Sequence, residues 1–86
     1  MSKSAVNFSV YTGAILEDTT NEKFLHYRGF KGRLFVKEGF SATFDMLRGY
    51  LYTSVVKKAT TEGNKLILTT LNSVYTFRIK DSKDEK

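Results

Sequence analysis

The chain contains no cysteine, no proline, no tryptophan and a single histidine, His26. Without cysteine it can form neither a disulfide nor a thiolate metal site, and one histidine alone is a poor start for a metal centre. A domain of 86 residues must therefore be held by packing alone, or by association with another chain. Because proline is absent, tight turns depend on glycine, asparagine and aspartate.

Catalytic signatures are equally scarce. No pair of acidic residues lies within an apolar run, where burial would raise the pKa of a carboxyl group for acid–base chemistry. Serines occur in strand or turn contexts such as Thr53-Ser54 and Asn72-Ser73, and the glycines that bracket residues 29–32 are too closely spaced for a phosphate-binding loop. We therefore predict a protein that is not an enzyme and that uses no cofactor and no metal.

Long apolar segments are also missing. The N-terminal residues lack the apolar run of a signal peptide, and no stretch approaches the roughly eighteen apolar residues of a membrane span. These absences favour a cytoplasmic protein with no membrane partner. We expect one domain over residues 5–80, with a flexible start at 1–4 and a disordered polar tail at 81–86.

Aromatic residues are abundant, with seven phenylalanines and five tyrosines, and they suit a pleated sheet better than a helix. The most regular alternation of apolar and polar residues lies between 64 and 80 and predicts a β-hairpin. With Asn72-Ser73 as its loop, Leu71 would lie opposite Val74 and Leu66 opposite Ile79. The inward face would then consist of Leu66, Leu68, Thr70, Tyr75, Phe77 and Ile79. The outward face would consist of Lys65, Ile67, Thr69, Thr76, Arg78 and Lys80.

The rest of the chain also favours short strands. We expect them at 6–11 with an extension over 14–16 after a bend at Gly13, at 24–30 in irregular form, and at 33–37, 40–45 and 50–58. Residues 17–22 are expected to form a surface loop, and 38–39 and 60–64 to form turns, with either Glu62-Gly63 or Gly63-Asn64 as the tight turn.

Two positions in these strands allow more than one interpretation. Residues 42–48 could instead form a short helix, with Ser41 as its N-cap and Gly49 as its terminating residue. Val55-Val56 would be apolar on both faces, which indicates a buried strand or a bulge. With five to seven antiparallel strands and no long helix, the chain is predicted to be an all-β domain, either a small closed barrel or a strongly bent sandwich.

Residues 49–56, Gly-Tyr-Leu-Tyr-Thr-Ser-Val-Val, are followed after a turn by residues 70–75, Thr-Leu-Asn-Ser-Val-Tyr. This segment resembles the closing half of small Src-homology-three-like barrels found among uncharacterised bacterial and prophage-encoded proteins. The resemblance rests on a glycine, a Thr-Ser-x-Val and an Asn-Ser-x-Tyr. It implies a barrel fold and a bacterial or prophage origin, and it implies no function.

The net charge of +5 is concentrated between residues 23 and 58, where eight basic residues outnumber two acidic ones. Tyrosines interleave with these cations, so nucleic-acid binding is one hypothesis, with bases stacked on the rings and phosphates contacted by lysine and arginine. We expect Phe30 and one of Tyr50 and Tyr52 to belong to the core instead. The candidate nucleic-acid-binding residues are Tyr27, Lys31, Arg33, Arg48, Tyr50, Lys57 and Lys58.

The competing hypothesis is recognition of another protein or self-association. Ile67, Leu71 and Val74 are neighbouring apolar residues on the hairpin face assigned outward, and Tyr52 is a further candidate. If the sheet curls over this face, they belong to the core instead. We rank protein recognition ahead of nucleic-acid binding, and such a module would suit a phage-encoded regulator or inhibitor of a host protein.

Overall fold

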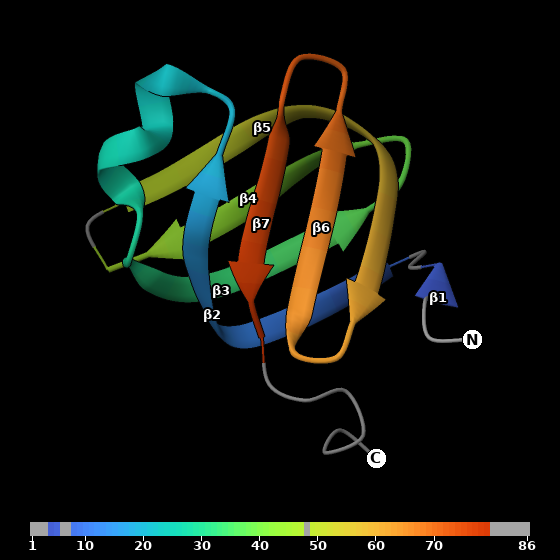
Figure 1. Cartoon of the computed structure of the whole chain (residues 1–86), viewed down its shortest axis with the longest axis horizontal. Helices are drawn as coiled ribbons and strands as arrows, with labels where there is room; N and C mark the ends of the chain where they lie inside the picture. Colours follow the sequence, from blue (N-terminus) through green and yellow to red (C-terminus); the bar gives the residue numbers. More distant parts are fainter. Residues whose placement is uncertain (1–3, 6–7, 48, 80–86) are drawn as a thin grey trace.

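Strands account for nearly all regular structure in the computed structural model, which describes residues 4–5, 8–47 and 49–79 (Figure 1). The predicted all-β class is confirmed, and the short helix considered for residues 42–48 is replaced by a strand over most of that range. The elements in chain order are β1 (Ser4–Ala5), β2 (Phe8–Thr19), the 3-10 helix η1 (Glu22–Tyr27), β3 (Lys31–Lys37), β4 (Ser41–Met46), β5 (Gly49–Glu62), β6 (Lys65–Thr70) and β7 (Val74–Arg78).

The strands from β2 to β7 form a closed antiparallel ring in which each strand pairs with the next and β7 returns to β2. Strand β1 adds to β5 outside the ring. In Figure 1 the second half of β2, β7 and β6 lie in front, and we call them the front layer. The first half of β2, β3, β4 and the first half of β5 form the back layer, which crosses behind. The result is a small, strongly bent barrel.

Two long strands bend so that each belongs to both layers. Strand β2 pairs with β3 as far as Ile15 and with β7 from Ile15 onward, and its register shifts around Gly13, whose φ is +74°. This conformation is easy only for glycine, which confirms the predicted bend. Strand β5 pairs with β4 up to Val55 and with β6 from Val56, with register shifts on both sides of this pair. The double-valine segment is therefore a bulged bend.

The core lies between the layers, and burial alternates along the strands except at their bends. In β3, for example, Leu34 and Val36 are fully buried while the residues on either side of each are not. Phe44 from the back layer meets Phe77 from the front layer edge to face, with ring centroids 5.0 Å apart. Burying such aromatic side chains supplies most of the driving force of a small β-domain without disulfides.

The C-terminal hairpin has the predicted faces in a different register. All six residues assigned inward are buried. However, Leu66 lies opposite Phe77 and Thr69 opposite Val74, so the pairing is shifted by two residues from the prediction and the loop is longer. A shift of two preserves which side chains face the core, so apolar alternation alone cannot detect it.

Thr70 is the reason for the longer loop. Its Oγ1 donates a hydrogen bond to the Ser73 carbonyl (2.9 Å) and accepts from the Ser73 N–H (3.1 Å) and from the Ser54 hydroxyl (2.8 Å). The Leu71 N–H then donates to the Val55 carbonyl rather than across the hairpin. Residues 70–73 are thus tied to the bend of β5, and the predicted two-residue turn is wrong.

Three further predictions need correction. The irregular strand predicted at 24–30 is instead mostly η1, which begins where the Asn21 side chain accepts a hydrogen bond from the Lys23 N–H. Phe24, Tyr27 and Phe30 recur every three residues, the period of a 3-10 helix, and they cover one end of the core. Strand β2 runs through Thr19 into the predicted loop, and β5 runs through Glu62 into the predicted turn, leaving Gly63-Asn64 as the tight turn. The predicted tail at 81–86 lies outside the described residues.

Replacing Thr70 with valine should destabilise the domain, because the Ser73 N–H and the Ser54 hydroxyl each lose a buried partner. We expect the free energy of unfolding to fall by about 1 to 3 kcal/mol. The matched control is Thr69→Val on the opposite side of the same strand, which should change stability by less than about 0.5 kcal/mol. Urea denaturation measures both, and equal effects would contradict this role for Thr70.

A second stability prediction concerns Gly32, which pairs with Met46 on the neighbouring antiparallel strand β4. A Cβ at this position would lie 2.4 Å from the Asp45 carbonyl oxygen, so the two backbones can approach this closely only without a side chain. Gly32→Ala should therefore cost about 1 to 3 kcal/mol of stability. Thermal unfolding would test it against the exposed control Ser41→Ala. A melting temperature of Gly32→Ala equal to that of wild type would refute the close approach of the two backbones.

Candidate interaction surface on the back layer

Large apolar side chains gather on the outer face of the back layer. Among the described residues, seven large apolar side chains are exposed, and five of them lie on this face or at its edge. The sixth member of the group, Phe35, is half-buried in their midst. We call this group the aromatic face: Val10, Phe35, Phe40, Tyr50, Tyr52 and Val55.

The strand register shows how these side chains are aligned. Val10 lies opposite Phe35, Phe35 opposite Thr43, and Thr43 opposite Tyr52, so one row of outward side chains crosses four strands. Residues paired in this way point to the same side of the sheet. The neighbouring row contains Tyr50. The face is thus continuous across the back layer.

The aromatic side chains at the two edges have defined neighbours. The rings of Tyr50 and Tyr52 stack with centroids 6.0 Å apart and an interplanar angle of 25°, although each side chain remains 61% exposed. The Lys37 ammonium lies over the Phe40 ring, 4.9 Å from its centroid. These contacts order the rings while leaving large areas open to a partner.

Cations occupy the middle strand of this surface. Lys31, Arg33 and Lys37 alternate with buried residues along β3 and therefore point outward with Phe35. The single carboxylate on the neighbouring strand, Asp45, lies opposite Arg33. Within the described part of the chain, neither Lys31 nor Arg33 takes part in an ion pair, so both charges are available to a ligand.

The candidate residues predicted from the sequence are divided among several surfaces. Arg33, Tyr50 and Tyr52 come together on the back layer, although they had been assigned to two competing functions. Both tyrosines are exposed, so the expectation that one of them would enter the core is wrong. Lys31 lies farther along β3, whereas Lys57 and Lys58 are exposed on β5 beyond its bend.

The remaining candidates do not join this group. Ile67 and Val74 lie on the outer face of the front layer, where both are half-buried, and Leu71 is 62% exposed in the β6–β7 loop. Tyr27 belongs to η1 and packs edge to face against Phe30. Arg48 lies outside the described residues.

Sequence reasoning missed Val10, Phe35, Phe40 and Val55. The sequence leaves the direction of Phe35 and Val55 open, because apolar residues lie next to them. Val10 and Phe40 alternate with polar residues, in step with Phe8 and with Ala42, which indicates the inward side, and the structure exposes both instead. The usable signal was in β3, where Leu34-Phe35-Val36 is apolar on both faces although cations flank it. A strand of that kind between outward cations indicates a second apolar surface in addition to the core.

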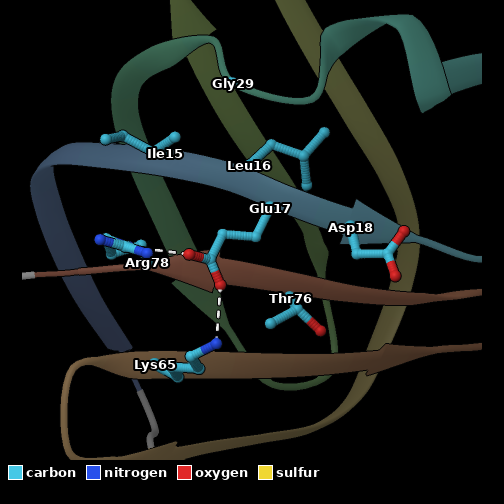
Figure 2. A pocket seen from close by; sticks show the side chains of 8 residues that line it. All are labelled: Ile15, Leu16, Glu17, Asp18, Gly29, Lys65, Thr76 and Arg78. Carbon is cyan, nitrogen blue, oxygen red and sulfur yellow. Dashed lines mark hydrogen bonds and ion pairs between the residues drawn. The ribbon is translucent and has the colours of Figure 1, made fainter.

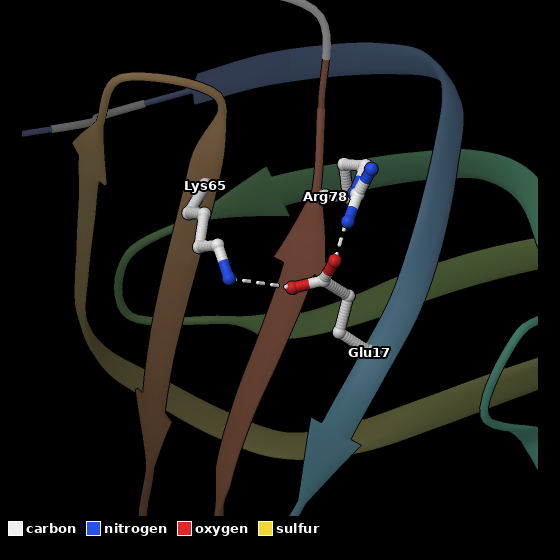
Figure 3. A network of polar contacts seen from close by, with 3 residues as sticks. All are labelled: Glu17, Lys65 and Arg78. Atoms are coloured by element: carbon white, nitrogen blue, oxygen red, sulfur yellow. Dashed lines mark hydrogen bonds and ion pairs between the residues drawn. The ribbon is translucent and has the colours of Figure 1, made fainter.

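The front layer has a different outer surface, centred on Glu17. Figure 2 shows a pocket lined by Ile15, Leu16, Glu17, Asp18, Gly29, Lys65, Thr76 and Arg78. Lys65 Nζ donates to Glu17 Oε1 at 2.9 Å, and Arg78 Nε donates to Oε2 at 2.7 Å (Figure 3). The hydrogen bond from Lys65, followed by that from Arg78, lowers the pKa of Glu17 below its usual value. One carboxylate thus pairs with both cations, and these two ion pairs connect three strands at this pocket.

Catalytic chemistry has little support in this arrangement. Glu17 is held ionised, which suits an ion pair and not a proton donor. Burial raises the pKa of Tyr75, but this side chain belongs to the core, and His26 is exposed with its ring against Tyr27. The described residues contain no cluster of histidine, aspartate and glutamate that could hold a metal ion.

Comparisons with protein-family models, with curated proteins and with solved structures find no match to this chain. The resemblance of residues 49–75 to Src-homology-three-like barrels therefore stays a prediction. No helix in the described residues has the length and apolarity needed to cross a membrane.

The Glu17 network makes stability depend on pH. The pKa of Glu17 is depressed in the folded protein, so its ionised form stabilises the fold above about pH 4.5, and this contribution disappears as pH falls through the folded-state value. Glu17→Gln should lower stability at pH 7 by less than about 1 kcal/mol, since both cations are exposed, and should have a smaller effect near pH 3. Thermal melts of wild type, Glu17→Gln and the unpaired control Glu62→Gln measure this difference, and an effect independent of pH would contradict it.

Proposed function

We propose that this protein is a non-enzymatic binding module that recognises another protein through the aromatic face. The observation that carries the proposal is that, of the seven large apolar side chains exposed among the described residues, five gather on or beside one outer face of a closed barrel. A barrel of this kind has no need of that face for its own core, and contiguous exposed apolar surfaces mark interaction sites. Tyrosine, phenylalanine and arginine are also the side chains enriched where proteins bind one another.

The composition of the face favours a protein over a nucleic acid. Val10 and Val55 are aliphatic and offer nothing to a stacked base, whereas they can pack against apolar side chains of a partner. Binding through phosphates also requires many cations, and only three point outward from β3.

The stacked tyrosines beside Arg33 are what favour the second candidate function, nucleic-acid binding, because exposed rings next to a guanidinium can stack bases. A bacterial or prophage origin, a cytoplasmic location and a role as a phage-encoded regulator or inhibitor are compatible with either function, and they remain predictions from the sequence.

Site-specific photocrosslinking in the native host tests the proposal. A benzophenone amino acid at position 52 should form an adduct with a protein, because Tyr52 is exposed and belongs to the stacked tyrosine pair of the aromatic face. The same group at position 76, on the outer face of the front layer, is the control and should give at most a tenth as much adduct. Mass spectrometry of the adduct shows whether the captured chain is a different protein or a second copy.

A second variant ensures that loss of the adduct is not caused by unfolding. Tyr50→Ser, combined with the crosslinker at position 52, should reduce the adduct severalfold with little change in melting temperature, since the Tyr50 side chain is mostly exposed. The proposal is wrong if neither position captures a protein, or if both capture it equally. Retention of single-stranded oligonucleotides that weakens steeply between about 50 and 200 mM salt would favour the alternative.

A further inference from the structure

We propose that the partner of the aromatic face is an acidic polypeptide segment in extended conformation, with an apolar side chain flanked by carboxylates two positions away on each side. This inference rests on the proposed function and adds the chemical class of the partner. It follows from the spacing and charge of the outward side chains of β3, the strand between β2 and β4 that carries the cations of this surface.

The spacing comes from the alternation of β3. Arg33, Phe35 and Lys37 are successive outward residues, because Leu34 and Val36 between them are fully buried. At about 3.3 Å per residue, the two cations originate roughly 13 Å apart, with the Phe35 ring midway. An extended chain has the same rise and also presents alternate side chains to one side. An acidic residue, an apolar residue and a second acidic residue at alternate positions would therefore match Arg33, Phe35 and Lys37.

Charge complementarity selects carboxylates for the two ends. Arg33 forms no ion pair with any of the described residues, and Lys37 has only the Phe40 ring beneath its ammonium. Among the described residues, Asp45 is the acidic residue paired opposite Arg33 on this face, and it is outnumbered by the cations of β3. Oppositely charged groups at the rim of an apolar patch fix the register of a partner and disfavour basic competitors.

The apolar centre offers the middle residue of such a segment a row of side chains to pack against. Phe35 is flanked across the strands by Val10 on one side and Thr43 on the other, and Tyr52 completes the row. A partner side chain above Phe35 would lie against this row and exclude water from it.

The same charges argue against a second copy as the occupant. Two copies would bring like-charged surfaces together, each chain carrying a net charge of +5. The sequence also contains no aliphatic or aromatic residue with an acidic residue two positions before it and another two positions after it. We therefore assign the surface to a different polypeptide.

Selection from a displayed library of random twelve-residue peptides tests this inference, with the full-length protein as the target. Enriched peptides should carry an aromatic or aliphatic residue with aspartate or glutamate two positions away on both sides. A synthetic peptide of the enriched sequence should bind wild type about fivefold to tenfold more tightly than Arg33→Glu or Lys37→Glu. The matched control Lys65→Glu, on the front layer, should leave the affinity unchanged.

A charge exchange identifies the contact directly. Selection against the doubly substituted Arg33→Glu, Lys37→Glu protein should enrich lysine or arginine at the positions where wild type selected acidic residues. Both variants alter exposed side chains, so melting temperatures near that of wild type would show that folding is retained.

The outcomes separate the two proposals. Enrichment of apolar peptides without acidic residues would overturn the acidic partner and leave protein recognition in place. Absence of any enriched peptide would overturn the extended segment, and photocrosslinking at position 52 would then decide the proposed function by itself. Peptides whose binding is insensitive to Arg33→Glu, Lys37→Glu and Phe35→Ser would refute the assignment to this face.

Discussion

Closure of the barrel depends on the two strands that change layers. Strands β2 and β5 each pair with one neighbour before a bend and with another after it, and without these bends the remaining strands would form an open sheet with two unpaired edges. The two bends use different means. In β2, Gly13 adopts a positive φ, whereas in β5 the residues around Val55 shift register on both sides. A chain without disulfides thus obtains a continuous hydrogen-bonded ring from local irregularities in only two strands.

Closure of the barrel also determines which side chains form its two outer surfaces. Since alternate residues of every strand fill the core, each layer has one remaining surface, and the two surfaces differ in chemistry. On the front layer, Glu17 engages Lys65 and Arg78, so their charges are largely satisfied internally. On the back layer, Arg33 forms no ion pair with any of the described residues and lies beside exposed aromatic rings. Among the described residues, cations without an ion-pair partner and a cluster of exposed apolar side chains thus occur together on the back layer, which is why we place recognition there.

Alternation in the sequence was sufficient to predict the fold class and most inward residues, because burial repeats with a period of two. It could not predict the pairing of the last hairpin, since moving one strand by two residues leaves both faces unchanged, and the deciding interactions come from Ser54 on a distant strand. The helix at residues 22–27 was missed because the spacing of Phe24, Leu25 and Tyr27 matches neither a strand nor an α-helix. The aromatic face was predicted only in part. Its tyrosines were recognised. Phe35 belongs to it only because neighbours on three other strands lie in the same row, and these neighbours are far apart along the chain.

The alternation of core and surface residues along β3 has an evolutionary consequence. Leu34 and Val36 maintain the core, while Arg33, Phe35 and Lys37, which alternate with them, point to the outer face. Substitutions at the outward positions can therefore accumulate without eroding foldability. A lineage under pressure from a changing partner could alter its target by exchanging a few charges and rings, while the scaffold beneath remained the same.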